Sequence, residues 1–183
     1  MKRISAAAAI LAVALLALTT SALPASAAAS NEFGERASSI LLSTEDAARL
    51  PPGTIGLCNA GWGDVSVQRY DNARFLGVVD LRCGDSKSGY VHVRANHQNQ
   101  WQSRINAVGG SGNWDDLMAW ATGEALRAPE AGYPKDVGGG KWCYTAPIFM
   151  SGPRGTVQYK PTIIVSTNNK LVITSYPSTN TAC

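Results

Sequence analysis

Apolar and polar positions alternate with different periods along the chain, and each period predicts an element. Between residues 33 and 49 the apolar positions recur at helical spacing until Pro51-Pro52-Gly53, which predicts an amphipathic helix. Asn113 can cap another helix, because Asp115 and Asp116 then fall in its first turn. The apolar face of that helix comprises Trp114, Leu117, Met118, Ala121 and Ala125.

Three short runs of alternating or β-branched residues predict strands at 65–70, 75–82 and 89–94. Turn-forming residues separate the runs, and an antiparallel meander is their simplest arrangement. The polar run 96–105 can begin a further helix. Residues 128–141 are rich in glycine and proline and predict a long surface loop, either functional or a plain connector.

The C-terminal pattern predicts a hairpin. Two β-rich runs, 155–167 and 171–177, flank an Asn-Asn-Lys turn. Pro161 interrupts the first run and indicates an edge or a bulge there, since proline donates no ladder hydrogen bond. With no repeat or linker visible, we expect one α+β domain over residues 28–183, in which an N-terminal helix or helices pack on a small antiparallel sheet.

The first 27 residues have the pattern of a secretory signal peptide. Lys2 and Arg3 precede an apolar run from Ile10 to Leu18, and small residues follow at 25–27. The run is too short to span a bilayer permanently, so we expect a secreted mature protein without a membrane segment. Loss of the leader would leave 14 basic against 13 acidic residues, a net charge of +1. This balance does not by itself indicate a nucleic-acid-binding protein.

Four cysteines, Cys58, Cys83, Cys143 and Cys183, lie beyond the leader. An oxidising compartment favours two disulfides over free thiols. Three pairings are possible, and the sequence does not choose among them, although Cys58–Cys83 and Cys143–Cys183 would close the shorter loops. The cysteines have no CxxC spacing and no histidine near them, so no metal site is predicted and no cofactor is expected.

Both histidines fall in the segment GYVHVRANHQNQW, residues 89–101. If residues 89–94 form a strand, Val91 and Val93 face the core while His92 and Arg94 lie side by side on the polar face, with His97 just beyond. Two imidazoles and a guanidinium suit metal-independent cleavage of RNA by its own 2′-hydroxyl. The competing interpretation is an exposed edge on which the histidines have no special role.

The last predicted strand offers a second polar group. Alternation places Val172, Thr174 and Tyr176 on one face, and it draws Ser175 inward with Leu171 and Ile173. Lys160 in the neighbouring run can add a positive charge to the polar face. Ordinary β-propensity explains the Thr and Tyr equally well.

Two segments resemble a known group of proteins. The stretches LRCGDSKSGYVHVRANHQNQW and PTIIVSTNNKLVITSYPS are similar to nuclease domains of the barnase, EndoU, colicin and RelE-like superfamily, and most similar to secreted bacterial ribonuclease toxins. In these toxins a Gly-x-x-His strand with a following histidine precedes a terminal hairpin that ends in a Thr-x-Tyr-Pro-like sequence, and His92 matches the strand histidine. The resemblance covers residues 81–101 and 155–178.

The resemblance implies a helical part packed on an antiparallel sheet whose face cleaves RNA without a metal, leaving a 2′,3′-cyclic phosphate. It implies that His92 and His97 share the acid and base roles and that Thr174 and Tyr176 position the phosphate or the base. Arg94 and Lys160 have no motif counterpart, and their chemistry alone suggests phosphate binding. The expected protein is a monomer whose partners are RNA and, for a toxin, an immunity protein.

Two other classes of function compete with a ribonuclease. A disulfide-stabilised inhibitor could insert the 128–141 loop into a protease, and the histidines would then be incidental. A carbohydrate- or cell-wall-binding module could stack sugars on Trp62, Trp101 and Trp142, which lie near predicted loops.

Overall fold

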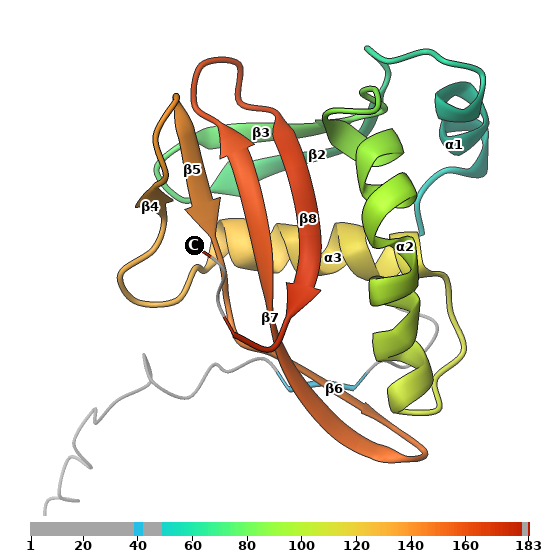
Figure 1. Cartoon of the computed structure of the whole chain (residues 1–183). Coiled ribbons are helices and arrows are strands. Elements are labelled where there is room, and N and C mark those ends of the chain that lie inside the picture. Colours follow the sequence, from blue (N-terminus) through green and yellow to red (C-terminus); the bar gives the residue numbers. More distant parts are fainter. Residues whose placement is uncertain (1–38, 42–48, 181–182) are drawn as a thin grey trace, which may run out of the picture. The chain divides into compact units, whose positions relative to one another are not determined.

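A computed structural model of the protein describes residues 39–41, 49–180 and 183 (Figure 1). Contacts group Phe33–Cys183 into one compact unit, separate from Met1–Glu32, and every described residue belongs to the former. The predicted leader, residues 1–27, lies outside the described residues. In chain order the elements are β1 (Ser39–Leu41), α1 (Pro52–Asn59), β2 (Ser66–Ala73), β3 (Gly77–Arg82), α2 (Gly89–Ala107), α3 (Trp114–Arg127), β4 (Lys135–Asp136), β5 (Lys141–Tyr144), β6 (Ile148–Gly152), β7 (Gly155–Ser166) and β8 (Val172–Ser178).

The predicted α+β class is confirmed. A six-stranded sheet has the order β1-β6-β7-β5-β4, with β8 paired to β7, and a two-stranded sheet contains β2 and β3. The six-stranded sheet is antiparallel except where β1 runs parallel to β6. The predicted C-terminal hairpin is confirmed as β7 and β8.

Pro161 does not mark an edge strand, because β7 is an interior strand. Pro161 interrupts the hydrogen bonding of β7 on one side only. On that side β5 pairs with β7 up to Tyr144 opposite Ile163, and β6 resumes the pairing in the same register from Ile148 opposite Tyr159. The ladder is interrupted between these pairs, where Pro161 has no N–H to donate. The carbonyl of Thr145, in the interruption, instead accepts a hydrogen bond from the Glu130 N–H at 2.8 Å.

The register of β7 and β8 gives the sheet two different faces. One carries Lys160, Thr162, Thr174, Tyr176 and Ser178, which we call the polar face. The opposite face is buried against α3, and there the Thr122 and Ser175 hydroxyls lie 2.8 Å apart. The inward position of Ser175 is therefore confirmed.

A bulge in β8 corrects the predicted alternation nearer the turn. Val165 pairs with Val172 and Ile164 pairs with Thr174, so Ile173 is an extra residue. Val172 consequently lies in the core and not on the polar face, while Ile173 is only partly buried.

The predicted strand 89–94 is wrong, because these residues begin helix α2. The six-residue window alternates, but the longer segment carries a helical stripe that continues to the helix C-cap. The stripe comprises Tyr90, Val93, His97, Trp101, Ile105 and Val108. His97 stands at the one position of this stripe that is not apolar, and without an apolar residue there the helical period is hard to recognise.

Helix α2 lies along the outer edge of β8 (Figure 1). The buried Trp101 indole donates a hydrogen bond to the Ser175 carbonyl at 3.0 Å. An edge carbonyl of the sheet is thereby satisfied by a side chain of the helix that covers it. This contact fixes the position of α2 beside β8.

Helix α3 agrees with the prediction. Asn113 occupies the N-cap position, although its side chain makes no capping hydrogen bond. Asp115 and Asp116 occupy the first turn, and all five residues of the predicted apolar face are buried. The predicted strands 65–70 and 75–82 are confirmed as the hairpin of β2 and β3, but the meander ends there because α2 follows.

The predicted helix 33–49 falls mostly outside the described residues, and where it is described it is wrong. Ser39–Leu41 forms strand β1, paired parallel to β6. The prolines expected to end that helix instead begin α1, since Pro52 occupies its first position, where the missing N–H has no cost.

Both disulfides are present, and they select one of the three possible pairings. Cys58 bonds to Cys83, with Cα atoms 4.9 Å apart, and Cys143 bonds to Cys183, with Cα atoms 6.0 Å apart. The first ties α1 to the end of β3, and the second ties the last residue to β5. In the part of the chain that the structure describes, none of the helices has both the length and the apolar character needed to cross a membrane.

Replacing Trp101 by Phe tests the contact between α2 and β8. The variant leaves the buried Ser175 carbonyl without its donor, so we expect the free energy of unfolding in urea to fall by about 1–3 kcal/mol. Trp62, which is 61% exposed, provides the matched control, and Trp62→Phe should change stability by less than about 0.5 kcal/mol. Equal effects of the two substitutions would contradict the assigned role of Trp101.

Candidate active site

The two histidines approach each other at the side of α2 that borders the polar face. Their ring centroids are 5.8 Å apart, with the ring planes at 70°. They are five positions apart on the helix, so their Cα atoms lie about 140° apart around its axis, and the two side chains converge. A helix, and not the strand predicted for residues 89–94, thus brings His92 and His97 close together.

The turn before α2 orients His92. The His92 Nδ1–H donates to the Ser86 carbonyl at 2.9 Å, since a carbonyl only accepts. The Asp85 carboxylate fixes this turn by accepting hydrogen bonds from the backbone N–H groups of Lys87 and Ser88 at 2.7 and 3.0 Å. In the neutral ring Nε2 therefore carries the lone pair.

Glycine is required at both ends of this turn. Gly84 and Gly89 have φ values of +68° and +77°. A Cβ at Gly84 would lie 2.0 Å from the Ser88 carbonyl oxygen, and one at Gly89 would lie 2.6 Å from the Arg82 carbonyl oxygen. The tight approach of these backbone segments places the Ser86 carbonyl above the first turn of α2.

A side-chain amide and an aromatic ring orient His97. Its Nδ1–H donates to Gln100 Oε1 at 3.1 Å, which again leaves Nε2 as the acceptor in the neutral ring. The ring stacks on Tyr176 of β8, with centroids 4.9 Å apart and planes at 27°. Burial lowers the pKa of His97; the hydrogen bond to Gln100 opposes this effect, and repulsion by His92 adds to it.

Strand β8 brings Tyr176 and Thr174 to the site on its polar face. Tyr176 pairs across the ladder with Thr162, and Thr174 lies two residues before it. The Thr174 hydroxyl is buried and has no hydrogen-bond partner among the residues that the structure describes. This hydroxyl has almost no exposed surface, so a ligand can reach it only if the groups that cover it move aside.

Lys160 lies on the same face, as predicted, but its charge is paired. The ladder places it opposite Ser178, one pair beyond Thr162 and Tyr176. Its ammonium contacts both carboxylate oxygens of Glu130, at 2.6 and 2.8 Å. No sequence pattern points to Glu130, because this ion pair depends on the interrupted ladder, where the Glu130 N–H donates to the Thr145 carbonyl.

Arg94 does not lie beside His92 as the predicted strand required. Two residues apart on a helix are separated by about 200° around the axis, so the two side chains diverge. The Arg94 guanidinium bonds to Asn59 of α1 and lies over the Tyr90 ring, 6.0 Å from its centroid. It is therefore part of the packing between α1 and α2.

The other predicted surface features, three tryptophans and the loop 128–141, lie in different parts of the fold. Trp101 is buried in a helix, Trp142 is partly buried in β5, and only Trp62 among the three is well exposed. The predicted loop 128–141 contains the short strand β4, which pairs with β5, and most of the segment is exposed.

Comparison with known proteins gives relatives without an assigned activity. No protein-family model matches the chain. It is similar to two proteins of Mycobacterium tuberculosis, "Uncharacterized protein MT0764" of strain CDC 1551 / Oshkosh and "Uncharacterized protein Rv0739" of strain ATCC 25618 / H37Rv. Each is 32% identical over 114 residues, which cover 59% of this chain and 41% of the relative. The chain thus matches about two fifths of the length of these relatives.

The surroundings of His97 predict its titration. Its pKa should lie below the ordinary value of 6.5 because burial favours the neutral ring. Replacing His92 by Asn removes a repulsive charge and should raise the pKa, whereas replacing Gln100 by Leu removes a favourable hydrogen bond and should lower it further. The measurement is an NMR titration of the imidazole signals. A pKa at or above 6.5, or shifts of the opposite sign, would contradict this environment.

Proposed function

We propose that the protein is an exported, metal-independent endoribonuclease whose active site is formed by His92, His97, Thr174 and Tyr176. The observation that carries the proposal is the pair of neighbouring imidazoles, each held at Nδ1 by an oxygen acceptor. Both rings thus offer Nε2 for proton transfer, and a pair of such groups is what cleavage by a 2′-hydroxyl requires.

We assign the base role to His97, because burial lowers its pKa and so favours the neutral ring. Its Nε2 removes the proton from the 2′-hydroxyl as the 2′ oxygen attacks phosphorus, and His92 takes the role of the acid. The bond from phosphorus to the 5′ oxygen breaks, and Nε2–H of protonated His92 donates its proton to that oxygen. The products are a 2′,3′-cyclic phosphate and a 5′-hydroxyl, and no water is consumed.

The polar face supplies the groups that bind the phosphate. Once the groups that cover it move aside, the unpaired Thr174 hydroxyl can donate to a phosphoryl oxygen, where it would stabilise the charge that develops during attack. The Tyr176 ring fixes the plane of His97, and its hydroxyl is a further neutral donor on this face. Arg94 has no part in this mechanism.

The family resemblance and the order of elements support the same proposal. The resemblance implies helices followed by an antiparallel sheet, and α2 and α3 precede β5, β6, β7 and β8. The leader-like N-terminus and the two disulfides support export. An antibacterial toxin with a cognate immunity protein is the role that the resemblance suggests for an exported ribonuclease.

Substitution of the histidines tests the proposal. Purified protein should degrade RNA in excess chelator, and His92→Ala and His97→Ala should each reduce the rate by a factor of about 100 or more, as loss of an acid or base does. Asn99 is exposed on the same helix, and Asn99→Ala should retain the full rate. Circular dichroism would check that all variants fold.

Three results would contradict the ribonuclease. The first is unchanged RNA degradation in both histidine variants, and the second is activity that needs a divalent cation. The third is protease inhibition that is lost when the 128–141 loop is cut and kept in both histidine variants, since this is the behaviour of the competing inhibitor.

A further inference from the structure

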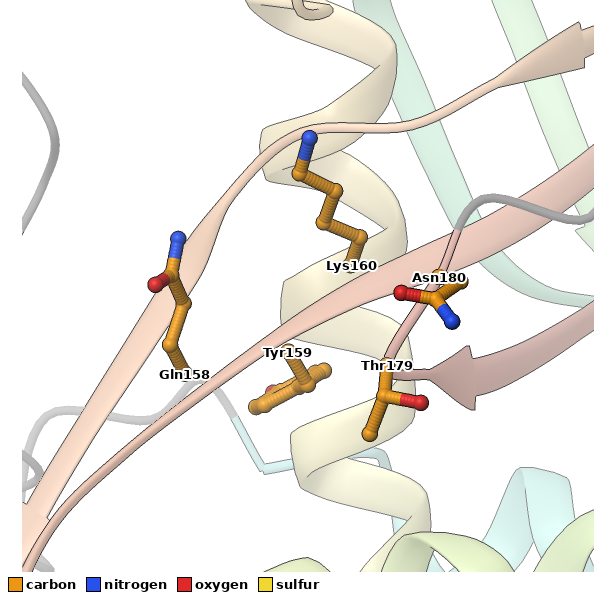
Figure 2. A pocket seen from close by; sticks show the side chains of 5 residues that line it. All are labelled: Gln158, Tyr159, Lys160, Thr179 and Asn180. Carbon is orange, nitrogen blue, oxygen red and sulfur yellow. The ribbon is translucent and has the colours of Figure 1, made fainter.

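A polar pocket lies next to the candidate active site, at the end of β8. It encloses about 320 Å³ and is lined by Gln158, Tyr159, Lys160, Thr179 and Asn180. Figure 2 shows that Gln158 and Lys160 extend to the same side of β7. The ladder between β7 and β8 ends at the pair of Lys160 and Ser178, so the pocket begins where the chain leaves the sheet.

The register fixes the distance of this pocket from the catalytic groups. Lys160 and Ser178 form the next pair on the polar face after Thr162 and Tyr176, and Tyr176 stacks on His97. A step of two residues along a strand is about 7 Å. This is comparable to the length of one nucleotide, so an RNA strand cleaved beside His97 can place an adjacent nucleotide at the pocket.

The lining suits a neutral polar ligand more than an anion. The Lys160 ammonium is already held by both oxygens of Glu130, which offsets its charge. Gln158 and Asn180 are exposed and each offers an amide that both donates and accepts hydrogen bonds. Such amides recognise the edges of nucleobases, and sequence-specific RNA recognition uses unstacked bases in this way.

The Tyr159 side chain lies on the other side of β7 from Gln158 and Lys160 (Figure 2). Its buried ring packs edge-on against Trp101, with centroids 6.0 Å apart, so its hydroxyl is not counted among the ligand-binding groups. A disulfide restrains the segment that carries Thr179 and Asn180. Cys183, three residues after Asn180, is bonded to Cys143 of β5.

We infer that this pocket binds the nucleobase of a nucleotide next to the cleaved phosphodiester, through the amides of Gln158 and Asn180. The inference rests on the proposed ribonuclease function and adds a base-selective subsite to it. Lys160 then acts beside this subsite and not at the reacting phosphate.

A binding experiment tests the subsite separately from cleavage. Single-stranded 2′-deoxy tetranucleotides of each base cannot react through a 2′-hydroxyl, so binding is measured without turnover. Titration into ¹⁵N-labelled protein should shift the side-chain amide signals of Gln158 and Asn180, most strongly for one base. The double variant Gln158→Ala, Asn180→Ala should bind at least about tenfold more weakly, as loss of base contacts does. Asn72 is exposed on β2, and Asn72→Ala is the matched control.

The outcomes separate the subsite from the catalytic proposal. Cleavage of RNA together with unchanged amide signals, or unchanged affinity in the double variant, overturns the subsite and leaves the ribonuclease intact. Base-dependent binding at the pocket in a protein that does not cleave RNA supports the subsite as a binding site and overturns the catalysis. Shifts of the same amides by neutral oligosaccharides but not by tetranucleotides overturn the inference in favour of a sugar site.

Discussion

The contact of α2 with the open edge of β8 determines the rest of the arrangement. Trp101 is fully buried and donates its indole N–H to the Ser175 carbonyl, while the Ser175 hydroxyl meets Thr122 of α3. One strand residue thus fixes two helices. A helix held in this way covers an edge that would otherwise expose unpaired backbone groups, and it brings His97, one turn before Trp101, against Tyr176.

The local geometry of the site follows from that position. His97 points to the polar face from a stripe whose other members are apolar, so it is half-buried and its pKa is lowered. The orientation of the His92 ring depends on the turn before α2, which Asp85 and two glycines stabilise. Cys83 directly precedes this turn and is bonded to Cys58 of α1. The disulfide therefore restrains the turn whose Ser86 carbonyl orients His92. Stability and the proposed catalysis therefore depend on the same few contacts.

The sequence predicted the elements with long or strongly patterned signals. Helix α3 has a full apolar face, and the terminal hairpin has two β-rich runs around an Asn-Asn turn, so both were predicted correctly. Helix α2 was mistaken for a strand because Val91, His92 and Val93 alternate over a window too short to distinguish the two periods.

Of the candidate site, the sequence identified the two histidines, Thr174 and Tyr176, and the structure brings them to one border of the sheet. It placed Arg94 wrongly, because the angle between neighbouring side chains depends on the type of element. Gln100, Ser86 and Glu130 were missed, since each acts through a contact that exists only once the turn, the helix and the interrupted ladder have formed.

The chemical form of the cleaved ends tests the proposed mechanism most directly. The substrate is a DNA strand that contains a single ribonucleotide, and ³¹P NMR identifies the product. Attack by a 2′-hydroxyl predicts cleavage only at the ribonucleotide, with a 2′,3′-cyclic phosphate on one fragment and a 5′-hydroxyl on the other. Fragments with 5′-phosphate ends, or cleavage of a strand that has no ribonucleotide, would contradict it.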